Sequence, residues 1–182
     1  MFKKVIIMSV ILSSLAGATV LAQWSAPKAP VIPEADGYVV IPNSAVPPEK
    51  DHVYKAIFES TALPKKYTDL LPAINMLGSE LNVLGVEGIP NENIKFAVVF
   101  HGPAAYGILD NNYYKKKFGV DNPNLKVLSE LKKSGVELFV CGQYLASADI
   151  DPKNLAPEIT IAVDAYIVLM TFHDKGYAIL SF

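Results

Sequence analysis

Arginine is absent from this chain of 182 residues, because all 16 of its basic residues are lysines. The planar guanidinium fork is the group that best grips phosphates and guanine edges, and here acidic residues are in slight excess, with a formal net charge of −2. We therefore expect no nucleic-acid partner. The chain is also not poor in apolar residues, since 51% of its residues are hydrophobic. That content excludes a disordered chain and, at this length, favours one domain with a sizeable core.

Cysteine is nearly absent as well, with Cys141 as its one representative. No internal disulfide is possible, and an odd thiol in an exported protein is buried and inert, paired between molecules, or reactive. Three scattered histidines and one cysteine show no metal-ligand spacing, so we expect no metal site and no cofactor. Phosphate-binding and hydrolase motifs are missing too, since no P-loop, Gly-x-Gly-x-x-Gly or Gly-x-Ser-x-Gly pattern occurs.

Residues 1–22 have the pattern of a cleavable signal peptide. Lys3 and Lys4 supply the positive start, residues 5–15 are apolar, and small residues precede a cleavage point at Ala22. The apolar run is too short for a bilayer core of about 30 Å, so we predict cleavage, export to the bacterial periplasm, and no remaining membrane span. Residues 23–50 form a proline-rich extended leader, which acts as a spacer or as a strap over the domain at residues 51–182.

Strand and helix patterns alternate through the predicted domain. Continuous apolar strands of the kind buried on both faces indicate a mainly parallel sheet covered by helices. We therefore predict an α/β three-layer sandwich with five strands. The predicted strands are 53–60, 95–100, 136–141, 159–163 and 177–182, and the predicted helices are 66–84, 123–134 and 164–175.

Two of these strands end on residues that can do chemistry. One runs into His101 and Gly102, and the other into Cys141, Gly142 and Gln143. Ligands of parallel sheets bind beyond the carboxyl ends of the strands, so we predict Cys141 and His101 as catalytic residues and Gly102, Gly142 and Gln143 as substrate-binding residues. A helix after Cys141 would stabilise its thiolate. The alternatives are a cysteine packed as a small hydrophobe and a neutral His101 that satisfies a loop carbonyl.

The segment 94–182 resembles the DsrE/DsrF-like proteins, a sulfur-relay family associated with dissimilatory sulfite reductase and with tRNA thiolation. The resemblance lies in His101-Gly102-Pro103, in the 135–137 lead into Val140-Cys141-Gly142, and in the closing strand at 176–180; it extends more loosely back to Val53. It implies a Rossmann-like fold with five parallel strands and assembly into homotrimers or homohexamers. It also implies that Cys141 accepts sulfur as a persulfide and passes it to a partner protein. The export signal places this chain with the exported branch.

Three functions follow from these patterns. The first is a persulfide or thiol relay through Cys141, with His101 and the following helix stabilising its thiolate. The second is a non-catalytic module of the same fold that binds a small ligand or assembles with itself, so whether the protein is an enzyme stays open. The third, a Cys-His hydrolase, needs an orienting carboxylate or amide and an oxyanion hole, and the sequence identifies neither.

Overall fold

Five parallel strands form one sheet in the order β4-β3-β2-β1-β5 in the computed structural model, which describes residues 24–182. The predicted signal peptide lies outside these residues. The strands are β1 (Tyr54–Ser60), β2 (Ile94–Phe100), β3 (Glu137–Cys141), β4 (Thr160–Ala162) and β5 (Ala178–Ser181). The predicted α/β fold with a five-stranded sheet is confirmed, and every strand pair is parallel.

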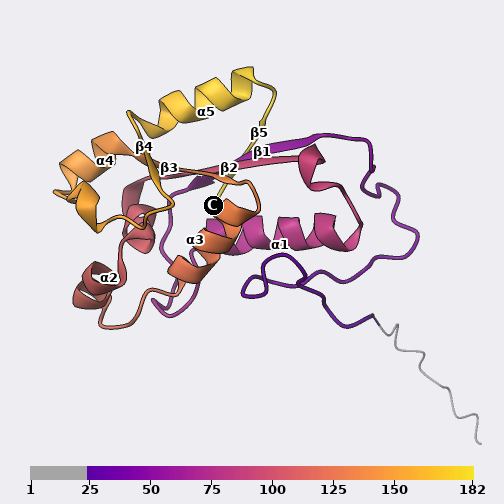
Figure 1. Cartoon of the computed structure of the whole chain (residues 1–182), viewed down its shortest axis with the longest axis horizontal. Helices are drawn as coiled ribbons and strands as arrows, with labels where there is room; N and C mark the ends of the chain where they lie inside the picture. Colours follow the sequence, from indigo (N-terminus) through magenta and orange to yellow (C-terminus); the bar gives the residue numbers. More distant parts are fainter. Residues whose placement is uncertain (1–23) are drawn as a thin grey trace, which may run out of the picture.

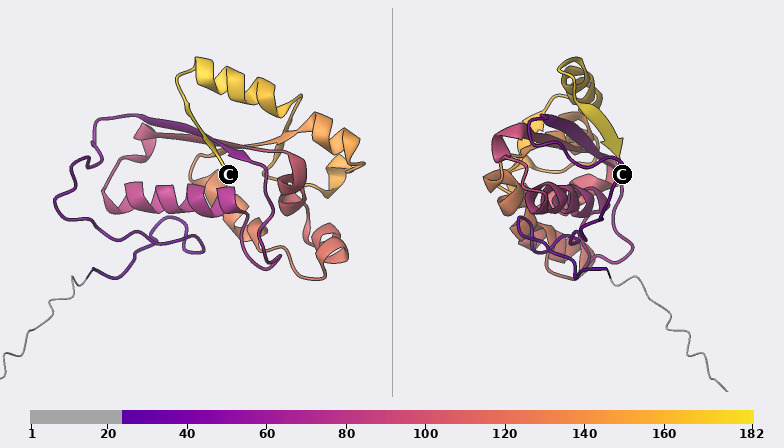
Figure 2. Two further views of the ribbon diagram at one scale, coloured as in Figure 1. Left: turned by 180° about the vertical axis from the view of Figure 1, so that it is seen from behind. Right: turned by 90° about the vertical axis from the view of Figure 1, so that its right-hand side faces the viewer.

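Helices cover both faces of the sheet (Figure 1). Helices α1 (Pro72–Val86) and α3 (Asn124–Lys133) pack on one face, and α5 (Ala165–Asp174) packs on the other. Because successive side chains of a strand point to opposite faces, Phe58 and Val98 join the α1 side while Ile57 and Val99 join the α5 side, all four fully buried. Figure 2 shows the three layers from behind and from one side.

The connections that follow β2 and β3 gather at the carboxyl ends of the strands. They comprise the 3-10 turn η2 (Gly102–Ile108) and the short helices α2 (Asn111–Phe118) and α4 (Gly142–Ser147). Two further 3-10 turns, η1 (Asn91–Asn93) and η3 (Pro152–Asn154), precede β2 and β4. Figure 1 shows α2 and α4 at the same end of the molecule, so any chemistry at this edge is framed by them.

Helix α1 begins later than the predicted helix at residues 66–84. It starts at Pro72, six residues after the expected start, and it ends at Val86. Proline fits the first turn of a helix, where its missing amide costs nothing, but inside a helix its ring clashes with the preceding turn. Pro72 therefore sets the start, and the apolar side chain of Leu71 is buried just before it.

The segment at residues 106–122 contains the end of η2 and the whole of helix α2. Its helix α2 buries Tyr114 completely, and the Tyr114 hydroxyl donates to the Tyr67 carbonyl at 2.8 Å. Lys115, Lys116 and Lys117 occupy the outer face of α2. The segment is thus anchored into the core by one aromatic residue.

The proline-rich leader packs against α1 as a strap. Ile32 is fully buried, and the buried Asn82 amide on α1 accepts from the Ile32 amide at 2.9 Å and donates to the Ile32 carbonyl at 3.0 Å. Gly78 leaves room for this approach, because a Cβ there would lie 2.5 Å from Ala35. Within residues 24–182, no helix has the length and apolar character needed to cross a bilayer.

Candidate functional site

Cys141 is the last residue of β3 and the N-cap of α4. Its Sγ accepts a hydrogen bond from the Tyr144 amide at 3.4 Å, and the residue is only 5% exposed. This amide belongs to the N-terminal end of the helix, which carries a partial positive charge. Gly142 allows this tight strand-to-helix turn, because a Cβ there would lie 2.7 Å from the Ala162 carbonyl oxygen.

Asp164 places a carboxylate beside the same sulfur. Its Oδ1 caps α5 by accepting hydrogen bonds from the backbone amides of Tyr166 at 2.8 Å and Ile167 at 3.3 Å. Its Oδ2 lies 3.7 Å from the Cys141 Sγ and accepts from the thiol. A carboxylate at this distance repels negative charge on the sulfur. The Tyr144 amide and the Asp164 carboxylate therefore act on the sulfur in opposite directions.

His101 follows β2 on the face of the sheet that α5 covers. The register pairs Phe100 with Val140, so His101 stands at the position directly opposite Cys141 on the neighbouring strand. Adjacent strands lie about 4.8 Å apart. The structure thus brings together the two residues predicted as catalytic, but among residues 24–182 no hydrogen bond joins their side chains.

The imidazole of His101 is held by a carboxylate on the other side. Its Nε2 lies 3.0 Å from Glu59 Oε1, and both side chains are 16% exposed. The Ser181 hydroxyl donates to Glu59 Oε2 at 2.5 Å, and the Tyr166 ring meets the imidazole edge-on, with centroids 5.7 Å apart. Among residues 24–182, the His101 ring therefore bonds to a carboxylate and not to a loop carbonyl.

The residues predicted to bind substrate lie next to this pair. Gly102 follows His101 with a φ of +57°, a conformation that favours glycine, and Gly142 and Gln143 form the first turn of α4. The backbone N–H of Gln143 donates a hydrogen bond to the Val163 carbonyl at 3.3 Å, so this N–H is not available to a ligand. Their role in binding stays a prediction.

Glu59 is the site residue that the sequence analysis missed. The signal was available, because Glu59 shares strand β1 with the fully buried Ile57 and points to the same face. A carboxylate that points inward from a strand needs a hydrogen-bond partner. The identity of that partner depends on the strand order, which the sequence does not state.

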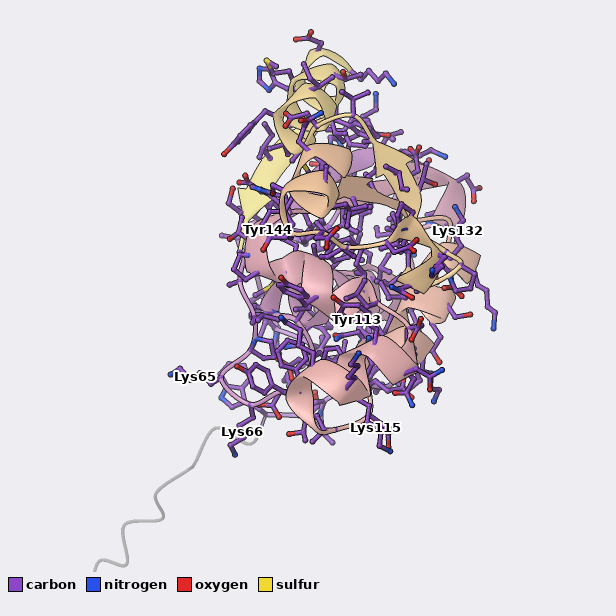
Figure 3. All side chains as sticks on the ribbon, turned by 90° about the vertical axis from the view of Figure 1, so that its left-hand side faces the viewer. Lys65, Lys66, Tyr113, Lys115, Lys132 and Tyr144 are labelled. Carbon is purple, nitrogen blue, oxygen red and sulfur yellow. The ribbon has the colours of Figure 1, made fainter. Side chains whose placement is uncertain are left out.

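Tyrosine side chains lie beside the site at the carboxyl edge of the sheet. Tyr144 sits in the first turn of α4, burial raises its pKa, and its ring meets Tyr106 edge-on at 6.5 Å. Figure 3 views this end of the molecule and shows Lys65 and Lys66 on the same end as Tyr144.

The other two histidines, His52 and His173, lie away from this site. Within the described part of the chain, no group of His, Cys, Asp and Glu side chains could hold a metal.

Comparisons with known proteins agree with this fold. A family model described as the DsrE/DsrF-like family matches residues 59–182. Among solved structures, the chain is similar to a protein of unknown function from Methanobacterium thermoautotrophicum, with 16% sequence identity and a TM-score of 0.53. It is also similar to the ychN protein from E. coli, with 14% identity and a TM-score of 0.52. Both alignments cover 71% of this chain and 99% of the other chain. No curated protein matches the chain.

Proposed function

Because the chain belongs to the DsrE/DsrF-like family, we propose that it relays sulfur through a persulfide on Cys141. The observation that carries this proposal is the position of the chain's one thiol. Its Sγ accepts a hydrogen bond from the Tyr144 backbone amide at the start of α4. The residue lies at the carboxyl edge of the sheet, opposite His101 on the neighbouring strand. Strand ends of this kind are where parallel sheets place their reactive groups.

The transfer step needs only a donor persulfide, R–S–SH. The Cys141 thiolate attacks the terminal sulfur of the donor, the new bond joins that sulfur to Sγ, and the donor S–S bond breaks. The donor leaves as a thiolate and takes up the proton that the Cys141 thiol lost. No oxidant or reductant is consumed, and delivery to an acceptor thiol is the same exchange in reverse.

A protein partner for donation or acceptance is part of the proposal. Cys141 is 5% exposed and lies at the carboxyl end of β3, where α4 begins, so a partner would approach it at this edge of the sheet. The exposed Lys65 and Lys66 lie on that end of the molecule (Figure 3), and they favour a partner with an acidic surface.

The experiment exploits the single cysteine of the chain. The protein is incubated with glutathione persulfide and its intact mass is measured, with Cys141→Ser as the control. We expect the native protein to gain the mass of one sulfur atom and the variant to gain none. A thiol that stays unreactive in the native protein, yet is modified once the protein is unfolded, would end the proposal.

A second candidate, an assembly module without chemistry, is favoured by an apolar groove between α5 and β5. Tyr166, Met170 and Ile179 line it and are 60%, 56% and 41% exposed. Apolar groups exposed together mark interaction sites, and we propose that this face joins copies of the chain into a homo-oligomer. Light scattering of the protein and of Met170→Lys tests this, with a smaller assembly expected for the variant. A Cys141→Ser variant that keeps every cellular phenotype would favour this module over the relay.

Export completes the proposal. The apolar segment at residues 5–15 after Lys3 and Lys4, with small residues up to Ala22, supports a cleaved signal and a periplasmic protein. The mass of the protein purified from cells gives the answer, since cleavage leaves Gln23 as the first residue. A full-length chain in the cytoplasmic fraction would contradict export.

A further inference from the structure

Three polar side chains form a connected row across the face of the sheet that α5 covers. Ser181 on β5 donates to Glu59 Oε2 at 2.5 Å, and Glu59 Oε1 lies 3.0 Å from His101 Nε2. The row continues toward Cys141, since His101 stands opposite Cys141 in the register of β2 with β3. The imidazole therefore lies on the strand between the one that carries the carboxylate and the one that carries the thiol.

The Glu59 contact fixes the proton position on the ring. An ionised carboxylate can only accept hydrogen bonds, so Nε2 carries the hydrogen. In the neutral imidazole this leaves Nδ1 with the free lone pair, which makes Nδ1 the nitrogen that can take a proton. The same carboxylate stabilises the imidazolium that forms when the ring does so.

We propose that Glu59 is a positioning residue for His101, and that His101 is the group which exchanges the proton of Cys141 during sulfur transfer. This inference rests on the proposed relay. The S–H bond of the resting thiol points to Asp164, so proton exchange with His101 requires a rotation about the Cα–Cβ bond of Cys141 that brings the thiol toward β2. An imidazole matches the proton affinity of a thiol far better than a carboxylate does.

A purely structural role for the pair is the weaker explanation. Both side chains of the Glu59–His101 pair keep 16% of their surface exposed, and Ser181 is exposed. The pair also does not satisfy a buried backbone group in the described part of the chain, because both side chains bond to each other and to Ser181.

A double-mutant cycle tests the proposal through the rate of sulfur uptake from glutathione persulfide. Glu59→Gln keeps the size of the side chain but removes the charge that selects one tautomer. We expect about a tenfold slower uptake, at least as large a loss for His101→Gln, and no further loss in the double variant. Glu137→Gln, at the exposed start of β3, is the matched control and should leave the rate unchanged. Losses that multiply in the double variant would overturn the inference.

Nitrogen NMR of the His101 ring gives a readout that does not depend on sulfur transfer. We expect the Nε2–H tautomer in the native protein and a mixture of tautomers in Glu59→Gln, while a native Nδ1–H tautomer would overturn the role of Glu59. If the native protein takes up no sulfur, the relay fails, and the ring spectrum still decides whether Glu59 positions His101. If sulfur uptake is normal and Glu59→Gln changes neither rate nor tautomer, only this inference fails.

Discussion

Replacing Asp164 with asparagine isolates the charge that the structure places beside the thiol. Asparagine is as good an N-cap as aspartate, so Asp164→Asn keeps the hydrogen bonds from the amides of Tyr166 and Ile167. It removes the negative charge 3.7 Å from the Cys141 Sγ. The variant should therefore react faster at its thiol than the native protein does.

The expected magnitude follows from Coulomb's law. Two unit charges about 4 Å apart interact by about 1 kcal/mol in water and by about 4 kcal/mol at an effective dielectric constant of 20. The two capping amides already offset part of the Asp164 charge, so we take the low end. About 1 kcal/mol corresponds to a roughly fivefold faster alkylation.

The assay is the rate of iodoacetamide labelling at neutral pH, followed by intact mass. Every label reports on Cys141, because no other cysteine is present. Asp174→Asn at the far end of α5 is the control for a charge change on the same helix, and it should leave the rate unchanged. An Asp164→Asn protein that is as stable as the native one but labels no faster would show that Asp164 is only a helix cap.

Three further changes test the packing and electrostatics of the site and of the rest of the fold. Gly142→Ala places a Cβ 2.7 Å from the Ala162 carbonyl and should lower the free energy of unfolding in urea by about 1–3 kcal/mol; an unchanged midpoint would contradict the close approach. Asn82→Ala leaves the buried amide of Ile32 without a partner and should cost about 1–3 kcal/mol and expose the leader to trypsin, whereas an intact leader would argue against the strap. Burial raises the pKa of Glu80, so the stability linked to its protonation is present in acid and lost as the pH rises through the raised pKa. Glu80→Gln should therefore stabilise the protein at neutral pH and not in acid, and a pH-independent difference would refute this linkage.

The layered fold was predictable because the strands are short, apolar and separated by helical patterns. Strands such as β2 have five consecutive buried residues. Such strands are typical of a parallel sheet that helices cover on both faces. The predicted start of α1 was wrong because the helical spacing of leucines continues before Pro72, although the helix begins at that proline.

The candidate site was predictable only in part, because its polar contacts join positions far apart in the chain. His101 and Cys141 could be placed at one edge of the sheet, since parallel strands end together. The partners Glu59 and Asp164 could not be assigned, because they are 42 and 23 residues from the groups they bind. Their convergence depends on the strand order, in which β5 returns beside β1 and carries Ser181 to Glu59.

The placement of Asp164 bears on how a relay would release its sulfur as well as accept it. A persulfide is more acidic than a thiol, so a sulfur carried on Cys141 would be an anion beside the Asp164 carboxylate. Repulsion between the two charges destabilises the loaded state relative to the resting thiol, whose S–H donates to the same oxygen. One carboxylate would then accept the S–H hydrogen bond of the empty protein and favour delivery of sulfur from the loaded one. A group that only capped α5 would need neither effect, and an asparagine at position 164 would serve it equally well.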